Sequence, residues 1–107
     1  MTNNENEDKS YTIFPSTTYK KELKKYKKSP ERIKAILEIV CILSEKGSEG
    51  IPPQKRPHPL TGNYKGSLEC HIEPDLLLIW TQDDENREIV LQRIGSHSDL
   101  FNRNTSH

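Results

Sequence analysis

The segment that decides the fold is LECHIEPDLLLIW, residues 68–80. Its first part alternates apolar and polar side chains, and this period of two is typical of a strand with one buried face. Its last five residues are continuously apolar, which predicts a strand buried on both faces. Between them, Glu73-Pro74-Asp75 has the composition of a tight turn. The segment therefore predicts two consecutive strands of one sheet, with Glu69 and His71 on the polar face of the first.

The flanking residues extend this sheet. Downstream, residues 83–86 predict a polar hairpin and residues 88–94 predict a last strand. A short polar segment follows Gly95 and ends in Leu100-Phe101. Far upstream, residues 11–14 form a short β-prone run that a proline ends, so they are compatible with a first strand.

Two helices are predicted between the first strand and the second. Ser16 or Thr17 can cap the first helix. Its apolar face carries three residues at helical spacing, Tyr19, Leu23 and Tyr26. Ser29 followed by Pro30 predicts the start of the second helix. Its apolar residues recur at helical spacing until the helix ends near Gly47, at Ile33, Ile36, Leu37, Val40 and Leu43.

Residues 47–66 form a long connection, which holds four of the seven prolines and four of the five glycines. Loops of this length inside a domain are uncommon, and they are usually functional or mobile. The predicted order of elements is β-α-α-β-β-β. This order indicates an α+β domain in which two helices pack on one face of a mainly antiparallel sheet.

The chain has 107 residues, which fits one domain. We expect a disordered acidic tail at 1–9, a folded domain at 10–101 and a flexible tail at 102–107. No apolar run approaches the ~18 residues of a membrane span, and the polar N-terminus does not resemble a signal peptide, so a cytoplasmic location is expected. Cys41 and Cys70 are predicted to be free, buried thiols of a reducing compartment.

The charge is balanced overall but unevenly distributed. Sixteen Lys and Arg residues offset sixteen Asp and Glu residues, and a net charge of zero by itself argues against an anionic partner. Residues 19–34, however, hold eight basic and two acidic side chains, a local net charge of +6. This basic helix is either a solvated surface or a binding surface for phosphates or an acidic partner. Its central lysines are Lys20, Lys21, Lys24 and Lys25.

Three of the four histidines, His58, His71 and His97, lie outside the apolar repeats, so the core does not need them. The predicted turn brings Asp75 to the same rim as His71. Imidazoles beside a carboxylate suit the general acid–base catalysis that RNA transesterification requires. Each could instead be an ordinary surface or turn residue. Zn²⁺ binding is a further alternative, although separations of 13, 4 and 22 residues match no standard ligand spacing.

Several short sequence blocks, taken in their order along the chain, resemble those of a known protein family. The blocks are HPL at 58–60, GNYKG at 62–66, ECHIEPD at 69–75 and RIGSH at 93–97, followed by Leu100-Phe101. Over about residues 10–101 the chain resembles the YafQ-type toxins of the RelE superfamily, which are ribosome-dependent mRNA endonucleases of bacterial type II toxin–antitoxin systems. The resemblance implies the RelE-like fold. It also implies site residues: His58, His71, Asp75 and His97 as catalytic, and Lys65, Arg93 and Phe101 as substrate-binding.

The activity that the resemblance implies is mRNA cleavage on the ribosome by 2′-hydroxyl attack, without metal or cofactor, which inhibits translation. His58 or Asp75 is the expected base, His97 the expected acid, and His71 orients or shares the proton transfers. The implied partners are a cognate antitoxin and mRNA with ribosomal RNA, whereas operator DNA is reached only through the antitoxin. The four lysines then contact ribosomal RNA or an acidic antitoxin segment.

Two positions depart from the family pattern, because relatives often carry tryptophan where this chain has Tyr64 and Leu76. An aromatic side chain lost after Asp75 would weaken base stacking, which contributes about 1–3 kcal/mol per base. Two alternatives therefore stay open. One is a catalytically impaired module that binds an antitoxin and co-represses its operon, and the other is a ribonuclease that acts without the ribosome.

Overall fold

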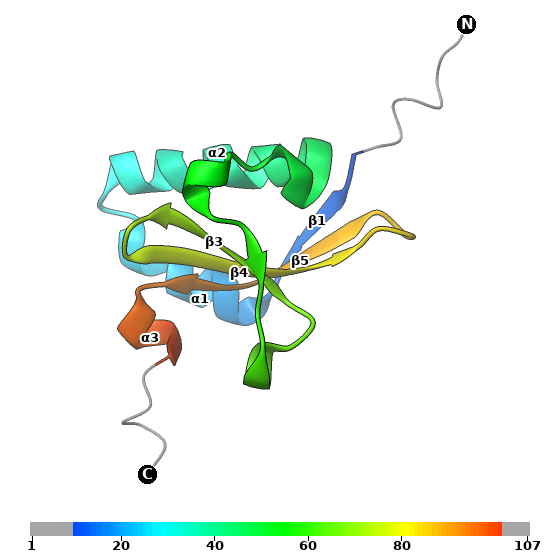
Figure 1. The fold of residues 1–107 in the computed structure, drawn as a ribbon. Helices are drawn as coiled ribbons and strands as arrows, with labels where there is room; N and C mark the ends of the chain where they lie inside the picture. Colours follow the sequence, from blue (N-terminus) through cyan, green and yellow to red (C-terminus); the bar gives the residue numbers. More distant parts are fainter. Residues whose placement is uncertain (1–9, 102–107) are drawn as a thin grey trace, which may run out of the picture.

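The strand pair predicted around the 73–75 turn lies inside a five-stranded sheet (Figure 1). The structure is a computed structural model that describes residues 10–101, so the tails predicted at 1–9 and 102–107 lie outside the described residues. The helices and strands are β1 (Thr12–Pro15), α1 (Thr17–Leu23), α2 (Pro30–Lys46), β2 (His58–Pro59), β3 (Leu68–Glu73), β4 (Leu76–Asp83), β5 (Glu88–Gly95) and α3 (His97–Phe101).

The sheet has the strand order β1-β5-β4-β3-β2. Only the β1–β5 pair is parallel, and the other three described pairs are antiparallel. The predicted α+β architecture is therefore confirmed. The 47–66 connection is more ordered than its composition suggested, because it contains three short 3₁₀ turns and the two-residue strand β2, which pairs with β3.

The helix boundaries follow the predicted capping signals. The Ser16 hydroxyl accepts a hydrogen bond from the Tyr19 amide at 3.0 Å, so Ser16 is the cap of α1. Beyond Leu23 the helix tightens into a 3₁₀ turn over Lys24–Tyr26. Helix α2 begins at Pro30 and ends at Lys46, and the residue that caps it, Gly47, has a positive φ of 69° that suits glycine.

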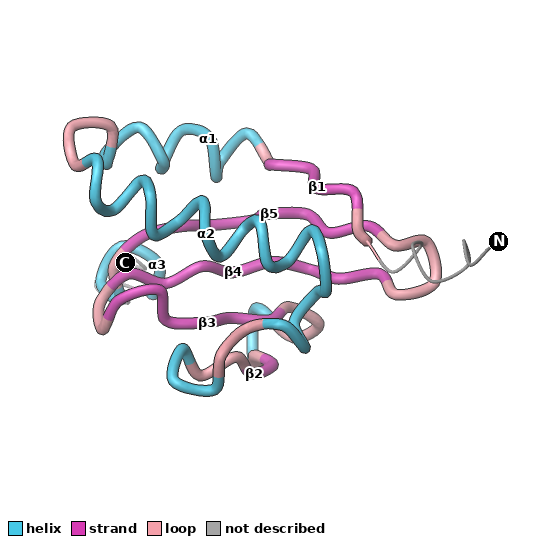
Figure 2. The backbone as a smooth tube through the Cα atoms, turned by 90° about the horizontal axis from the view of Figure 1, so that it is seen from above, coloured by secondary structure: helices cyan, strands magenta, loops and turns pink. Residues whose placement is uncertain are grey.

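Helix α2 covers one face of the sheet, whereas α1 continues from β1 and runs beside β5 (Figure 2). Both helices contribute to one apolar core around Trp80. Two details of the predicted α2 stripe are wrong: Leu37 is 56% exposed, and Ile39 is buried in its place. Cys41 is also exposed, so only Cys70 is a buried thiol, and both cysteines are free.

A second, smaller apolar cluster lies on the opposite face of the sheet. Leu77 and Ile79 of β4 form it with Leu100, and Leu60, Tyr64 and Phe101 pack against it. Leu100 and Phe101 belong to α3, a short helix where the sequence indicated only a polar segment. Strand β4 is therefore buried on both faces, as predicted. No helix in the described part of the chain is long and apolar enough to cross a membrane.

Candidate active site

The candidate site lies on the sheet face that α2 leaves uncovered. Residues in register on neighbouring strands point to the same face. One such row joins His58 of β2, Glu69 of β3, Ile79 of β4 and Arg93 of β5. His71 is in register with Leu77 and so points to this same face. The β2–β3 pairing therefore brings His58 to His71, although the two are thirteen positions apart in the sequence.

Asp75 and His97 form the most direct contact of the site. His97 Nδ1 lies 2.7 Å from Asp75 Oδ1, and the His97 backbone amide donates to the same oxygen at 2.8 Å. The backbone and ring hydrogen bonds from His97 lower the pKa of Asp75. When the His97 ring is neutral, an ionised Asp75 keeps its single proton on Nδ1. The other ring nitrogen, Nε2, is then available to exchange a proton with a substrate.

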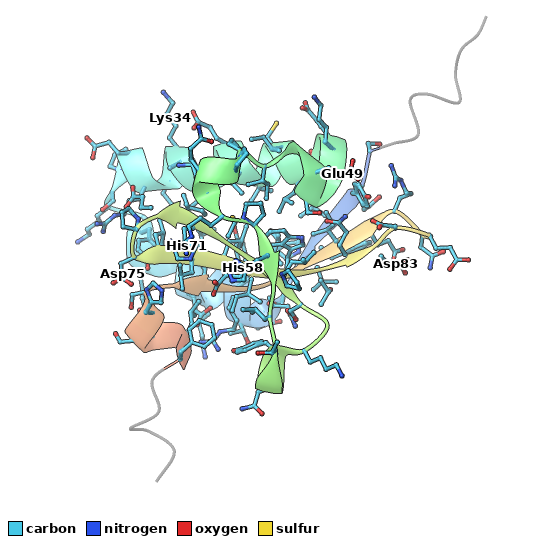
Figure 3. All side chains as sticks on the ribbon, in the orientation of Figure 1. Lys34, Glu49, His58, His71, Asp75 and Asp83 are labelled. Atoms are coloured by element: carbon cyan, nitrogen blue, oxygen red, sulfur yellow. The ribbon has the colours of Figure 1, made fainter. Side chains whose placement is uncertain are left out.

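The three predicted histidines lie in a row with His71 at its centre. The ring centroids of His71 and His97 are 5.6 Å apart, and those of His58 and His71 are 6.2 Å apart. Figure 3 shows His58 and His71 together on the face of the sheet, with Asp75 at the adjacent turn. The structure therefore brings the four predicted catalytic residues together.

The site also contains Glu69, a carboxylate to which the sequence analysis assigned no role. Its side chain is only 6% exposed, and its Oε1 lies 3.2 Å from His58 Nε2 and 3.7 Å from His71 Nε2. On its other side, His58 Nδ1 lies 2.7 Å from the Arg56 carbonyl oxygen. The signal that could have identified Glu69 is its alternation with His71, which places both side chains on one face of β3.

Arg93 and the two aromatic residues form the border of the site next to β5. The Arg93 guanidinium donates to both carboxylate oxygens of Glu22 and, at 2.7 Å, to the Tyr64 hydroxyl. Its hydrogen bonds to Glu22 raise the pKa of Arg93. The rings of Tyr64 and Phe101 meet edge to face at 5.7 Å. Arg93 is thus held in place by α1, beside an aromatic pair.

Leu76, which like Tyr64 departs from the family pattern, points away from the site. Its side chain is buried in the core beneath α2, so this position offers no surface for base stacking. Lys65 is exposed, directly after the turn that carries Tyr64.

The lysine-rich surface lies outside the histidine cluster but borders it. Its four predicted contact residues are exposed on α1 and the following turn. Lys25 Nζ lies 3.6 Å from a carboxylate oxygen of Asp99 in α3, the helix that begins with His97. The lysine-rich surface and the histidine cluster are therefore neighbours. Among residues 10–101, no group of three or more His, Cys, Asp and Glu side chains is arranged to hold a metal ion.

Comparison with known proteins identifies the class to which this chain belongs. A family model described as "Bacterial toxin of type II toxin-antitoxin system, YafQ" matches residues 11–102. The protein is therefore a bacterial toxin of the type II toxin–antitoxin class. More narrowly, the chain belongs to the YafQ family.

Three relatives illustrate the similarity. The mRNA interferase toxin YafQ of Escherichia coli (strain K12) is 37% identical over 51 residues, which span 48% of this chain and about half (53%) of that protein. The YafQ chain of the E. coli DinJ–YafQ toxin–antitoxin complex superposes with a TM-score of 0.74 at 28% identity, over 86% of this chain and 98% of that one. A metal-bound toxin from Helicobacter pylori superposes with a TM-score of 0.72 at 34% identity, over 85% and 99%.

Proposed function

We propose that this toxin is an mRNA interferase that cleaves mRNA on the translating ribosome by general acid–base catalysis. The observation that carries the proposal is the Asp75–His97 pair beside His71 and His58, on the sheet face opposite α2. The E. coli relative, which bears the name mRNA interferase, supports it. The site of action is the cytoplasm, where ribosomes are found.

The geometry supports a division of roles. A base takes the proton of the 2′-hydroxyl, the oxygen attacks the neighbouring phosphorus, and the bond to the 5′-oxygen breaks as that oxygen receives a proton. His97 suits the acid role, because the ionised Asp75 stabilises its protonated ring. The same contacts make Asp75 a weaker base than an ordinary carboxylate, since they lower its pKa. His58 is therefore favoured over Asp75 as the base, with His71 between base and acid.

The remaining predicted residues suit substrate binding. The Arg93 guanidinium and the exposed Lys65 supply positive charge for the phosphate that becomes more negative in the transition state. The edge of the Tyr64–Phe101 pair offers an aromatic surface for a base. Together they support the proposal that phosphate and base are recognised next to the proton-transfer groups.

One assay tests three parts of the proposal: the need for the ribosome, the chemistry of the cleaved ends and the independence of metal. Purified toxin is mixed with mRNA on translating ribosomes, with the same mRNA alone, and with ribosomes in the presence of EDTA. We expect fragments with a 5′-hydroxyl and a 2′,3′-cyclic or 3′-phosphate end on ribosomes only, at an unchanged rate in EDTA. Equal cleavage of mRNA alone supports the ribosome-independent alternative. Loss of activity in EDTA that zinc restores supports the metal alternative.

The partner is a cognate antitoxin, as the complex of E. coli YafQ with DinJ suggests. Inducing the toxin alone should arrest growth, and co-expression of the antitoxin gene should relieve the arrest. Absence of arrest, together with antitoxin binding and operon repression, would instead support the catalytically impaired module.

The lysine-rich surface is proposed to bind ribosomal RNA. Four Gln substitutions, at Lys20, Lys21, Lys24 and Lys25, remove four positive charges. We expect ribosome association to weaken and to depend less steeply on salt, because fewer counterions are released. Co-sedimentation with ribosomes across a salt series measures this. Unchanged association would assign the surface to the antitoxin, and the circular dichroism spectrum controls for folding.

A further inference from the structure

The hydroxyl group of Tyr64 has a hydrogen-bond donor beside it but no acceptor within the described part of the chain. Arg93 Nη1 donates to the Tyr64 oxygen at 2.7 Å. A phenol also carries one O–H donor of its own. Among residues 10–101, no oxygen or nitrogen atom accepts that proton. The Tyr64 O–H is therefore free to donate to solvent or to a ligand.

A second tyrosine–arginine pair, beside the hairpin that follows β4, shows how such a hydroxyl is completed. The Tyr11 oxygen accepts from Arg87 Nη1 at 3.0 Å, and its own proton goes to Asp84 Oδ1 at 2.7 Å. A carboxylate oxygen thus closes that network inside the protein. Tyr64 has the same arginine contact without the carboxylate. The acceptor that would complete it is an anionic oxygen supplied by a ligand.

The guanidinium of Arg93 is largely engaged by Glu22. The Glu22 carboxylate accepts from Arg93 Nε at 3.0 Å and from Nη2 at 2.6 Å, and its side chain is only 12% exposed. Glu22 Oε1 also accepts from the Ile94 amide at 3.0 Å, which fixes the carboxylate against β5. Nη1 points to Tyr64 instead, and hydrogen bonds in a chain polarise one another. Arg93 therefore acts on an anion in part through the Tyr64 hydroxyl.

The Tyr64 ring is held in place by its loop and by the smaller apolar cluster. The Leu60 amide donates to the Ser67 carbonyl, and the Ser67 amide donates to the Tyr64 carbonyl, both at 2.9 Å. The ring packs against the cluster and meets Phe101 edge to face. Because these contacts already restrict the ring, a hydrogen bond from its hydroxyl to a ligand costs little additional ordering.

We propose that the Tyr64 hydroxyl is a catalytic group that donates a hydrogen bond to a non-bridging oxygen of the scissile phosphate. This proposal rests on the function proposed above. Arg93 lies in the same cross-strand row as His58, so the hydroxyl that it contacts borders the histidine cluster. The non-bridging oxygens gain negative charge as the 2′-oxygen attacks phosphorus, so a fixed donor stabilises the transition state more than the ground state. The O–H bond stays intact throughout.

The test compares Tyr64→Phe with Tyr11→Phe. Each substitution keeps the ring and removes one hydroxyl that accepts from an arginine. Single-turnover cleavage on ribosomes over a range of toxin concentrations reports kcat separately from KM. In Tyr64→Phe we expect kcat to fall about 10- to 100-fold, the range that a hydrogen bond to a charged group contributes, with KM nearly unchanged. Tyr11→Phe should keep the wild-type kcat and KM.

A phosphorothioate at the cleavage site separates a phosphate contact from a structural role. In this substrate sulfur, a weak hydrogen-bond acceptor, replaces one non-bridging oxygen. The loss of kcat caused by Tyr64→Phe should shrink for the diastereomer in which sulfur takes the place of the contacted oxygen, and persist for the other. An equal loss with both diastereomers would overturn the proposal, as would a wild-type kcat in Tyr64→Phe.

A binding measurement that needs no cleavage separates this proposal from the proposed function. The ¹³C chemical shift of Tyr64 Cζ is followed in the free toxin during titration with inorganic phosphate and, separately, with adenosine. We expect phosphate to move the shift of Tyr64 but not that of Tyr11, whose proton is bound by Asp84. A response to adenosine but not to phosphate would limit Tyr64 to base stacking and overturn the proposal. A phosphate response in a toxin that cleaves no mRNA would contradict the proposed function and leave the phosphate contact established.

Discussion

Strand β4 has an aspartate at each end, and the two aspartates differ in what they bind. Asp75 directly precedes the strand and Asp83 ends it, on opposite sides of the molecule (Figure 3). Both are exposed, and backbone amides lower the pKa of both carboxyl groups. Asp75 binds His97, twenty-two residues further along the chain, whereas Asp83 binds the amides of Glu85 and Asn86 within its own turn.

The comparison shows that a lowered pKa does not by itself identify a functional carboxylate. At the Asp83 end, the hydrogen bonds close a hairpin, and the nearby Tyr11 is anchored by Asp84 at 2.7 Å and by the Arg87 guanidinium above its ring. None of these neighbours is an imidazole. At the Asp75 end, the same kind of hydrogen bond holds the His97 ring, the proposed general acid. A candidate site is therefore distinguished from a structural turn by the hydrogen-bond partner of the carboxylate, not by its lowered pKa.

The largest expected effect comes from removing the ring at the Asp75 end. His97→Ala should slow mRNA cleavage on ribosomes by about 10²- to 10⁴-fold, because it removes the group proposed to protonate the leaving 5′-oxygen. Asn86→Ala makes the matched change at the Asp83 end and should leave the rate unchanged. Single-turnover cleavage measures both. Wild-type activity of His97→Ala would contradict the assigned acid.

A smaller effect is expected from the carboxylates themselves. Asp75→Asn keeps an oxygen for the His97 amide but removes the charge that stabilises the protonated ring. We expect cleavage to slow about 10- to 100-fold, less than the full contribution of an acid or base. Asp83→Asn is the control for the loss of one negative charge next to β4. Equal rates for the two variants would mean that Asp75 is only a turn residue.

The apolar pattern predicted the two central strands, whereas the candidate catalytic set came from histidines outside the apolar repeats and from the family resemblance. A continuous apolar run predicted β4, whose residues 76–80 each pack in one of two cores, and hydrophobic periodicity predicted β3. Periodicity is ambiguous in α2, where apolar residues are dense enough to define two overlapping stripes, so Leu37 was assigned to the core in place of Ile39. Strand β2 and helix α3 are too short to show any period.

The same reasoning explains why Glu69 and Glu22 had no assigned role. Acidic residues are almost never fully buried unless paired, so sequence reasoning places them at the surface. Their burial depends on pairings across the sheet: Glu69 with His58 through β2, and Glu22 with Arg93 through the position of α1 along β5. Neither contact has a local sequence signal, because each joins segments that come together only in the folded chain.

The smallest expected effect is on stability, and here the two ends of β4 should behave alike. A carboxylate whose pKa is lowered by folding stabilises the fold above its unfolded value, about 3.9 for Asp, and this contribution is lost as the pH falls through the lower, folded value. Wild type should therefore have a slightly higher Tm than Asp75→Asn and than Asp83→Asn at pH 7. Both differences should shrink as the pH falls below about 4. Thermal unfolding followed by circular dichroism between neutral and acidic pH measures them.

A difference that persists at the acid limit would show that the aspartates act through shape rather than charge. Equal stability effects with unequal cleavage rates would establish that the two turns share their electrostatics and differ only in function.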